Sequence, residues 1–318
     1  MERMYVGPKQ KTIENNNFFD ASITLVGNNK NGNVSFNNKL SFEYWNPDNN
    51  LKEIFFYNEQ FKNIDTEIEL VAHDPYLISK CVLPKKALLI CKNSDNILNI
   101  LNDKIKTHQM FNGVVPMLNY KIIKGSEILA FDNEDISKEL VIQLPYGGGG
   151  SKTYICKKNN IEEIKRQILL DENYSISEYE KDNISYNTHC IIGKKEIEIL
   201  APSEQILEIN HKIEFIGSEF VIKIEDIIKE KMIKYSMKIC EKLQKLGYRG
   251  VLGIDWIYAN DELFFIEINP RFQGSTRQVD MLLKKSNLPS IFELNYLAFY
   301  SNYLPNTKNM LFSLFLQD

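Results

Sequence analysis

The alternation of apolar and polar residues in the first part of the chain predicts short elements separated by turns. Between residues 18 and 101, the apolar runs ASITLVG, EIFFYN, EIELVAHD and ALLICK are separated by turn-rich stretches such as GNNKNGN and NPDNN. Short apolar runs with this punctuation are typical of an α/β unit around a central sheet. The segment contains no GxGxxG motif, so dinucleotide binding is not predicted.

Helix and strand signals alternate in the middle of the chain. Asp103 is a suitable N-cap for a helix over DKIKTHQMFN, and Gly113 is a suitable residue to end it. The run VIQLPYGGGGSKTYIC predicts a strand, a glycine loop and a second strand. Asn160 and Glu163 have the spacing of a capping box for a helix over NIEEIKRQILL. The runs ENYSISEY and NTHCIIGKKEIEIL predict further strands.

A long amphipathic helix is the clearest element of the C-terminal part. It is predicted over residues 225–246, where apolar residues recur every three or four positions, and Gly247 ends it. The run IFELNYLAFYSNYL predicts a final helix whose aromatic residues pack in the core. The pattern places domain boundaries near residues 100 and 180.

Composition excludes several functional classes. The 38 basic and 42 acidic residues leave a net charge of −4, which argues against nucleic-acid binding because that requires clustered excess cations. The five cysteines form no CxxC pair, so neither a zinc site nor a disulfide framework is expected. The N-terminal stretch lacks an apolar signal region, and no apolar run approaches the roughly 18 residues that span a membrane. We therefore expect a cytoplasmic protein without a membrane partner.

The stretch LFFIEINPR is unusual, because an apolar strand ends in polar and charged side chains whose burial costs free energy. GVLGIDWIYANDELFFIEIN predicts a hairpin in which Glu267 and Asn269 share one face. A three-residue turn centred on Asp261 pairs Asp255 with Glu267. A two-residue turn would instead pair Asp255 with Ile266 and send the two acids to opposite faces. A site that uses both carboxylates therefore requires the three-residue turn.

Two carboxylates and an amide oxygen on one sheet face form a ligand set that suits Mg²⁺ carried on phosphates. The guanidinium of Arg271 would reach a phosphoryl or carboxylate oxygen beside the metal. The alternative is a solvated acidic hairpin. That alternative accounts for Asp255 and Glu267 separately, but it gives no reason for Glu-x-Asn-Pro-Arg to follow LFFI.

The glycine loop PYGGGGSKT is similar to a phosphate-binding P-loop but departs from it in two ways. Ser151 stands between the last glycine and Lys152, and the strand TYIC follows where a P-loop would begin a helix. Four glycines between two strands predict a flexible flap whose backbone N–H groups close over phosphates. A hairpin tip without function is the alternative.

At this point the chain resembles the ATP-grasp superfamily, through GYRGVLGIDW with LFFIEINPRFQG and through DKIKTHQMFNGVVP. The resemblance implies an α/β (α+β) ATP-grasp fold that binds nucleotide between two α+β subdomains. It implies an N-terminal α/β pre-ATP-grasp domain over residues 1–100. A small subdomain with the flap follows over 101–180, and a C-terminal subdomain with the metal-binding hairpin over 181–318.

The resemblance also implies roles for individual residues. Asp255, Glu267 and Asn269 would hold one or two Mg²⁺ ions, with Mn²⁺ as an alternative, on the β- and γ-phosphates of ATP. Arg271 would steady the transferred phosphoryl group, so Arg271, Glu267 and Asn269 form the catalytic set. The implied nucleotide-binding residues are Lys106, Gln143, Gly147, Gly148, Gly149, Gly150, Ser151, Lys152, Glu178, Tyr179 and Glu180. Gln143 departs from the family, which usually carries a second lysine there.

The implied activity is that of an ATP-dependent carboxylate–amine ligase. Its substrates would be a small carboxylic acid and an amine, either free or on an acyl-carrier protein, joined through an acylphosphate. A small-molecule kinase and, because of Gln143, a non-catalytic nucleotide-binding regulator are the alternatives. A monomer and an oligomer are both compatible with the sequence.

Candidate substrate contacts follow the metal-binding strand or precede the hairpin. They are Arg249, Gly274, Ser275, Thr276 and Arg277. Helix N-capping is the alternative role for Ser275 and Thr276, and a surface position is the alternative for Arg249. The four histidines share no metal-ligand spacing and receive no role; they are His73, His108, His189 and His211. The absence of GxSxG and of a Cys–His partnership argues against a nucleophilic hydrolase.

Overall fold

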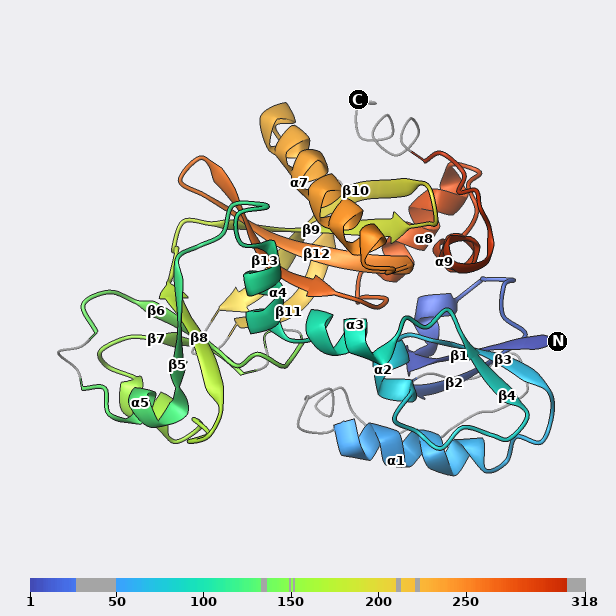
Figure 1. Ribbon diagram of the computed structural model, residues 1–318, viewed down its shortest axis with the longest axis horizontal. Coiled ribbons are helices and arrows are strands. Elements are labelled where there is room, and N and C mark those ends of the chain that lie inside the picture. Colours follow the sequence, from blue (N-terminus) through green and yellow to red (C-terminus); the bar gives the residue numbers. More distant parts are fainter. Residues whose placement is uncertain are drawn as a thin grey trace.

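A computed structural model describes residues 1–26, 50–132, 136–148, 150, 152–209, 213–220 and 224–307. These residues form three sheets, each in its own lobe (Figure 1). His211, Gly149 and Ser151 lie outside the described residues. Within the described part of the chain, no helix is long and apolar enough to cross a membrane.

The N-terminal lobe contains a four-stranded parallel sheet with strand order β2-β1-β3-β4. Its strands are β1 (Glu2–Lys9), β2 (Ala21–Val26), β3 (Ile68–Ala72) and β4 (Ala87–Ile90). Its helices are η1 (Gln10–Ile13), α1 (Asn50–Phe61) and α2 (Pro75–Ile78), and the following helix α3 (Asp95–Leu101) packs in the core of the third lobe. The predicted α/β unit is thus confirmed, although the run EIFFYN lies in helix α1. Strand β1 was not predicted, because its apolar stretch is short and its burial comes from neighbouring strands.

The second lobe contains a four-stranded antiparallel sheet with order β5-β8-β6-β7. Its elements are β5 (Tyr120–Lys124), α5 (Gly125–Leu129), β6 (Leu140–Gln143), β7 (Thr153–Cys156), α6 (Ile161–Lys165) and β8 (Asn173–Glu178). The predicted capping box at α6 does not form. Asn160 instead donates to the carbonyl of Ile155 and accepts from the backbone N–H of Lys157.

The third lobe contains a five-stranded antiparallel sheet with order β11-β10-β9-β12-β13. Its strands are β9 (Ile184–Ile192), β10 (Ile197–Ile209), β11 (Ile213–Glu219), β12 (Gly250–Ala259) and β13 (Glu262–Asn269). The helices are α4 (Lys104–Phe111), α7 (Asp226–Lys245), α8 (Thr276–Lys285) and α9 (Ile291–Tyr300). The predicted helix over 225–246 is confirmed. The helix predicted over IFELNYLAFYSNYL forms but ends at Tyr300, so the run SNYL lies outside it. The side chain of Asp103 caps α4 at the N–H of Lys106, as expected.

The two faces of the central sheet are covered differently, and this difference creates room for a site. Leu252, Ile254 and Trp256 of β12 pack in the core that contains α7. On the opposite face, Val251 packs in the core that contains α8 and α9. Gly253 and Asp255 lie farther along this second face, because side chains alternate along a strand. Asp255 lines a cavity there.

Candidate active site

The β12–β13 hairpin brings the two predicted carboxylates together. Asp255 pairs directly with Glu267, so the predicted pairing is confirmed. The predicted three-residue turn is wrong. Ala259 pairs with Glu262, and the two residues between them have φ angles of 51° and 60°, as in a type I′ turn.

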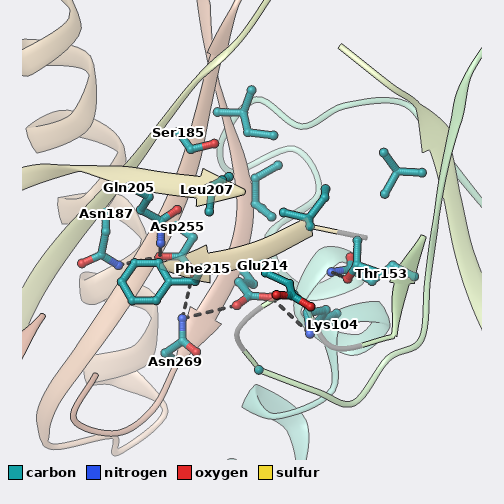
Figure 2. A pocket seen from close by; sticks show the side chains of 18 of the residues that line it. Lys104, Thr153, Ser185, Asn187, Gln205, Leu207, Glu214, Phe215, Asp255 and Asn269 are labelled. Carbon is teal, nitrogen blue, oxygen red and sulfur yellow. Dashed lines mark hydrogen bonds and ion pairs between the residues drawn. The ribbon is translucent and has the colours of Figure 1, made fainter. Parts of the chain in front are cut away.

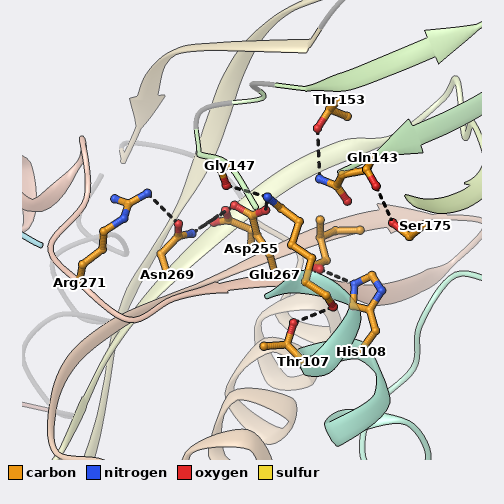
Figure 3. Close-up of polar contacts among 12 residues, drawn as sticks. Thr107, His108, Gln143, Gly147, Thr153, Ser175, Asp255, Glu267, Asn269 and Arg271 are labelled. Atoms are coloured by element: carbon orange, nitrogen blue, oxygen red, sulfur yellow. Dashed lines mark hydrogen bonds and ion pairs between the residues drawn. The ribbon is translucent and has the colours of Figure 1, made fainter. Parts of the chain in front are cut away.

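A β-bulge restores the pairing that the two-residue turn would otherwise prevent. Trp256 pairs with Phe265, while Asp255 pairs with Glu267, so Ile266 is the extra residue. The carbonyl of Ile266 accepts a 2.6 Å hydrogen bond from Nε2 of His108 on α4 (Figure 3). The N–H of Phe265 donates to the carbonyl of Pro116 at 2.9 Å. Contacts from outside the hairpin therefore support the register that pairs Asp255 with Glu267. His108 contributes one of these contacts, a structural role that its position in the sequence did not indicate.

Amide groups surround the carboxylate of Asp255. Asn269 donates to Asp255 Oδ2 at 3.0 Å and to Glu267 Oε1 at 3.4 Å. Asn187 and Gln205, on strands β9 and β10, donate to Asp255 Oδ1 (Figure 2). Sequence reasoning missed these two residues, because only the pairing of β9 and β10 with distant segments brings them here.

The two carboxylates have opposite electrostatic environments. Burial raises the pKa of Asp255 well above its usual range, and the charge of Glu267 raises it further. Burial acts on Glu267 in the same direction, but the ammonium of Lys104, a hydrogen bond with Asp255 and the charge of Arg271 together lower the pKa of Glu267. The two carboxylates therefore repel each other, and Asp255 has the higher proton affinity of the pair.

The donor set fits a hard divalent cation. Among the described residues, no three His, Cys, Asp or Glu side chains cluster as a metal site. The set that does converge consists of Asp255, Glu267 and the amide of Asn269. The carboxylates offer oxygen atoms to a metal, and Asn269 would add a third if its amide turned Oδ1 from Arg271 toward the acids. A cation at this position would offset the repulsion between the two carboxylates.

Lys104, and not Lys106, reaches the cavity from helix α4. Lys104 is 7% exposed, and its Nζ lies 2.7 Å from the carbonyl of Gly147 and 3.2 Å from Glu267 Oε2 (Figure 2). The side chain of Lys106 is 50% exposed and pairs with Asp103 at 3.1 Å. Residues two positions apart on an α-helix point in nearly opposite directions, so only one of the two lysines can face the cavity.

Asp255, Glu267 and Asn269 are called the clamp here, and the described glycines of the loop lie close to Arg271 and to β11. A Cβ at Gly148 would lie 2.9 Å from Nη2 of Arg271. Gly150 has φ of +84°, and a Cβ there would lie 1.6 Å from the carbonyl oxygen of Ile213 on β11. The close backbone approach explains why glycine is needed at position 150.

Arg271 joins the clamp to the N-terminal lobe. Its Nη2 donates to Asn269 Oδ1 at 3.0 Å, and its Nη1 donates to the carbonyl of Phe272 at 3.1 Å. Its Nε lies 4.0 Å from Oδ2 of Asp74. Asp74 caps helix α2 through the N–H groups of Tyr76 and Leu77. The guanidinium therefore has a fixed position at the cavity wall.

The cavity has a volume of about 950 Å³ and is lined by residues from all three lobes. Among the residues predicted to bind nucleotide, those that line it are Gln143, Gly148, Gly150, Lys152, Glu178, Tyr179 and Glu180. Gln143 donates to Oγ1 of Thr153 at 3.2 Å (Figure 3). Glu180 accepts from Asn260 at 3.1 Å, and Glu178 pairs with Lys138 at 2.7 Å.

The predicted substrate contacts divide into two groups. Gly274 and Ser275 line the cavity. Ser275 is at the N-cap position of α8, but its side chain makes no capping hydrogen bond. Thr276 is fully buried, and its Oγ1 accepts from the N–H of Gln273 at 2.8 Å. Thr276 is therefore a structural residue of the loop.

The two arginines proposed for the substrate have other partners and do not line the cavity. Arg277 pairs with Glu14 at 2.7 Å. Arg249 donates to the carbonyls of Gln244 and Tyr248 at the end of α7. The alternative of a structural position is therefore the better description of Arg249.

Comparison with known proteins gives these features a context. Residues 101–275 match the ATP-grasp domain family, which is more than half of the chain. Tyramine–L-glutamate ligase of Methanocaldococcus jannaschii is 33% identical over 148 residues, which cover 43% of this chain and 45% of that protein. The butirosin acyl-carrier protein–L-glutamate ligase of Niallia circulans is 26% identical over 171 residues, covering 51% and 39%. The matched part thus spans less than half the length of these curated relatives.

The fold comparison extends over nearly the whole chain. The biotin carboxylase domain of the 2-oxoglutarate carboxylase of Hydrogenobacter thermophilus, solved with MgADP, has a TM-score of 0.61. It is 13% identical, and the alignment covers 98% of this chain and 72% of that one. At this identity the similarity describes the fold alone. The family match and the arrangement of the lobes lead to one conclusion: the chain belongs to the ATP-grasp domain family and has its α/β fold.

Proposed function

We propose that the protein is an ATP-dependent ligase that joins a carboxylate to an amine. The observation that carries the proposal is the convergence of the clamp with Arg271 beneath the glycine loop, in a cavity about 950 Å³ in volume. Membership of the ATP-grasp family supports it. Two curated relatives bear the names of L-glutamate ligases, which supports the same reaction class.

MgATP fits the residues that converge. Asp255, Glu267 and Asn269 would hold one or two Mg²⁺ ions, or Mn²⁺, and the metal when bound would neutralise charge on the phosphates. Lys104 takes the place first assigned to Lys106, because its ammonium lies between the glycine loop and Glu267. Gln143 would donate to the nucleotide without supplying charge.

The remaining nucleotide contacts lie at the other end of the cavity. Residues 178–180 would bind the base and ribose, while the backbone of residues 147–151 and Lys152 would cover the phosphates. Nucleotide would thus lie between subdomains 101–180 and 181–318, with 1–100 as the preceding domain.

The protein's own groups would act mainly by positioning and charge neutralisation. A carboxylate oxygen of the acid attacks the γ-phosphorus of ATP, and the bond to the ADP oxygen breaks. Arg271 would stabilise the charge on the phosphoryl oxygens during this transfer. The amine then attacks the acyl carbon, phosphate leaves and the amine nitrogen loses a proton. The glycine loop would exclude water that competes with the amine.

We propose L-glutamate as the acid, because the names of both relatives include it. The acceptor would be a small amine such as tyramine, or an amine on an acyl-carrier protein, as the name of the Niallia circulans relative suggests. The described cysteines are buried free thiols, which supports a cytoplasmic location.

An ADP-release screen of acid and amine pairs, with mass detection of the product, tests the proposal. We expect acid-dependent ADP release and an amide product, both lost in Glu267→Ala. Hydroxylamine distinguishes the kinase alternative, because an acylphosphate gives a hydroxamate and a phosphate ester does not. ATP binding without ADP release across a broad panel would favour the regulatory alternative, which the amide at Gln143 motivates.

A further inference from the structure

Gln273 is a buried polar residue of the cavity that the proposed function does not use. It follows Arg271 by two positions, is 8% exposed and lines the cavity. Among the described residues, its carbonyl oxygen Oε1 has no hydrogen-bond partner. Buried acceptors of this kind are rare in folded proteins, and each calls for an explanation.

The backbone of Gln273 is fixed by Thr276, and its carboxamide is placed by Gly253. The backbone N–H of Gln273 donates to Oγ1 of Thr276 at 2.8 Å, and the N–H of Thr276 donates back to the backbone carbonyl of Gln273 at 3.1 Å. The carboxamide lies directly over Gly253. A Cβ at Gly253 would lie 2.1 Å from both Nε2 and Oε1 of Gln273. The absence of a side chain at position 253 therefore makes the space that the carboxamide fills.

This arrangement places the carboxamide beside the clamp. Gly253 and Asp255 lie two positions apart on β12 and so share one face of the sheet. Gly253 also pairs with Asn269, which belongs to the clamp. A carboxamide oxygen accepts hydrogen bonds, so the group that pairs with it in a bound ligand would be a donor. Phosphate groups and an ionised carboxylate offer only acceptors, so among the reacting groups the donor must be an amino group.

We propose that Oε1 of Gln273 accepts a hydrogen bond from a substrate amino group, and that Gln273 is a specificity residue of the site. The proposal rests on the proposed ligase function. The amino group has two sources: the α-amino group of an amino acid that serves as the acid, or the amine that attacks the acylphosphate. Both present an N–H to the same acceptor.

Binding measured by calorimetry, with Mg²⁺ and a non-hydrolysable ATP analogue, tests the proposal without turnover. L-Glutamate is compared with glutarate, which lacks the α-amino group, and tyramine with 4-ethylphenol, which lacks the amine. Wild-type protein should prefer the amino compound of at least one pair by roughly 10-fold or more, the effect of a lost buried hydrogen bond. The pair that shows the preference identifies the source.

Three variants give the measurement its controls. Gln273→Leu should abolish the preference. Gly253→Ala should do the same, because its methyl group displaces the carboxamide, and the two changes together should lose no more than either alone. Gln278→Leu makes the same chemical change at an exposed position of α8 and should retain the preference. Urea unfolding and analogue binding confirm that each variant is folded.

The outcomes separate this inference from the ligase proposal. If Gln273→Leu keeps the wild-type preference, the inference is wrong, while acid-dependent ADP release would still support a ligase. The inference is also overturned if the wild type binds each amino compound no better than its analogue. Failure of the ligase proposal appears separately, as absence of ADP release in the wild type.

Discussion

The bulge at Ile266 yields a prediction that connects one hydrogen bond to metal binding. His108→Leu removes the 2.6 Å bond to the Ile266 carbonyl. Leaving a buried carbonyl without a donor costs about 1–3 kcal/mol. Leucine recovers part of this through apolar contact, because the His108 ring packs 4.8 Å from the ring of Tyr120 and 5.8 Å from that of Phe265. We expect a net loss of about 1–2 kcal/mol in the free energy of unfolding.

The consequence for the site follows from the register. A slip of one residue at the bulge would pair Asp255 with Ile266 and carry Glu267 to the other face of the sheet. If the loss of His108 leaves the slipped register about 1.4 kcal/mol more stable than the bulged one, only about a tenth of the molecules keep both acids on one face, and divalent cation binding weakens about tenfold. Urea unfolding measures the first effect. Titration with Mn²⁺, followed by electron paramagnetic resonance with an ATP analogue present, measures the second.

His108→Gln is the matched control, because a glutamine amide can donate to the same carbonyl. It should recover most of the Mn²⁺ affinity. A variant His108→Leu that loses stability but keeps wild-type Mn²⁺ affinity would refute the reasoning. The bond between Phe265 N–H and the Pro116 carbonyl would then be sufficient to hold the bulge.

Further predictions concern the clamp, the lysines and the buried histidines. Glu267→Ala should abolish ATP turnover with little change in urea midpoint; near-normal ADP release would contradict its role. Lys104→Met should weaken ATP binding, measured by calorimetry, about tenfold. Lys106→Met should leave ATP binding unchanged, because the Lys106 side chain is half exposed. Equal effects of the two substitutions would contradict the choice of Lys104 as the nucleotide-binding lysine. Burial lowers the pKa of His73 and His189 to about 3. The unfolded chain therefore binds more protons below about pH 6.5, and the free energy of unfolding should fall by about 2 kcal/mol per histidine between about pH 7 and about pH 5. His189→Gln should remove its share of this slope in urea unfolding, and an unchanged slope would contradict the assignment.

The clamp was predictable because its signal is local. Glu267 and Asn269 alternate along β13, with Arg271 two positions beyond its end, and alternation alone places the first two on one face. The pairing of Asp255 with Glu267 was also predicted, but through a turn that does not exist. The two-residue turn satisfies local backbone preference, and contacts from α4 and Pro116 accompany the bulge that corrects the register.

Lys104 shows why local similarity was insufficient for the lysine. Both Lys104 and Lys106 belong to the same segment, and nothing in their spacing says which face of α4 meets the cavity. The packing of α4 against β13 decides the question, together with the carbonyl of Gly147 and the carboxylate of Glu267.

The sequence by itself determined the strand that bears the clamp, the glycine loop and the four helices α4, α6, α7 and α9, because hydrophobic periodicity, caps and alternation act between residues a few positions apart. Only the tertiary structure decided the bulged register, the choice of Lys104 and the amides of Asn187, Gln205 and Gln273 near Asp255. These features depend on contacts between segments that lie far apart in the chain. A local sequence pattern does not predict the energies of such contacts.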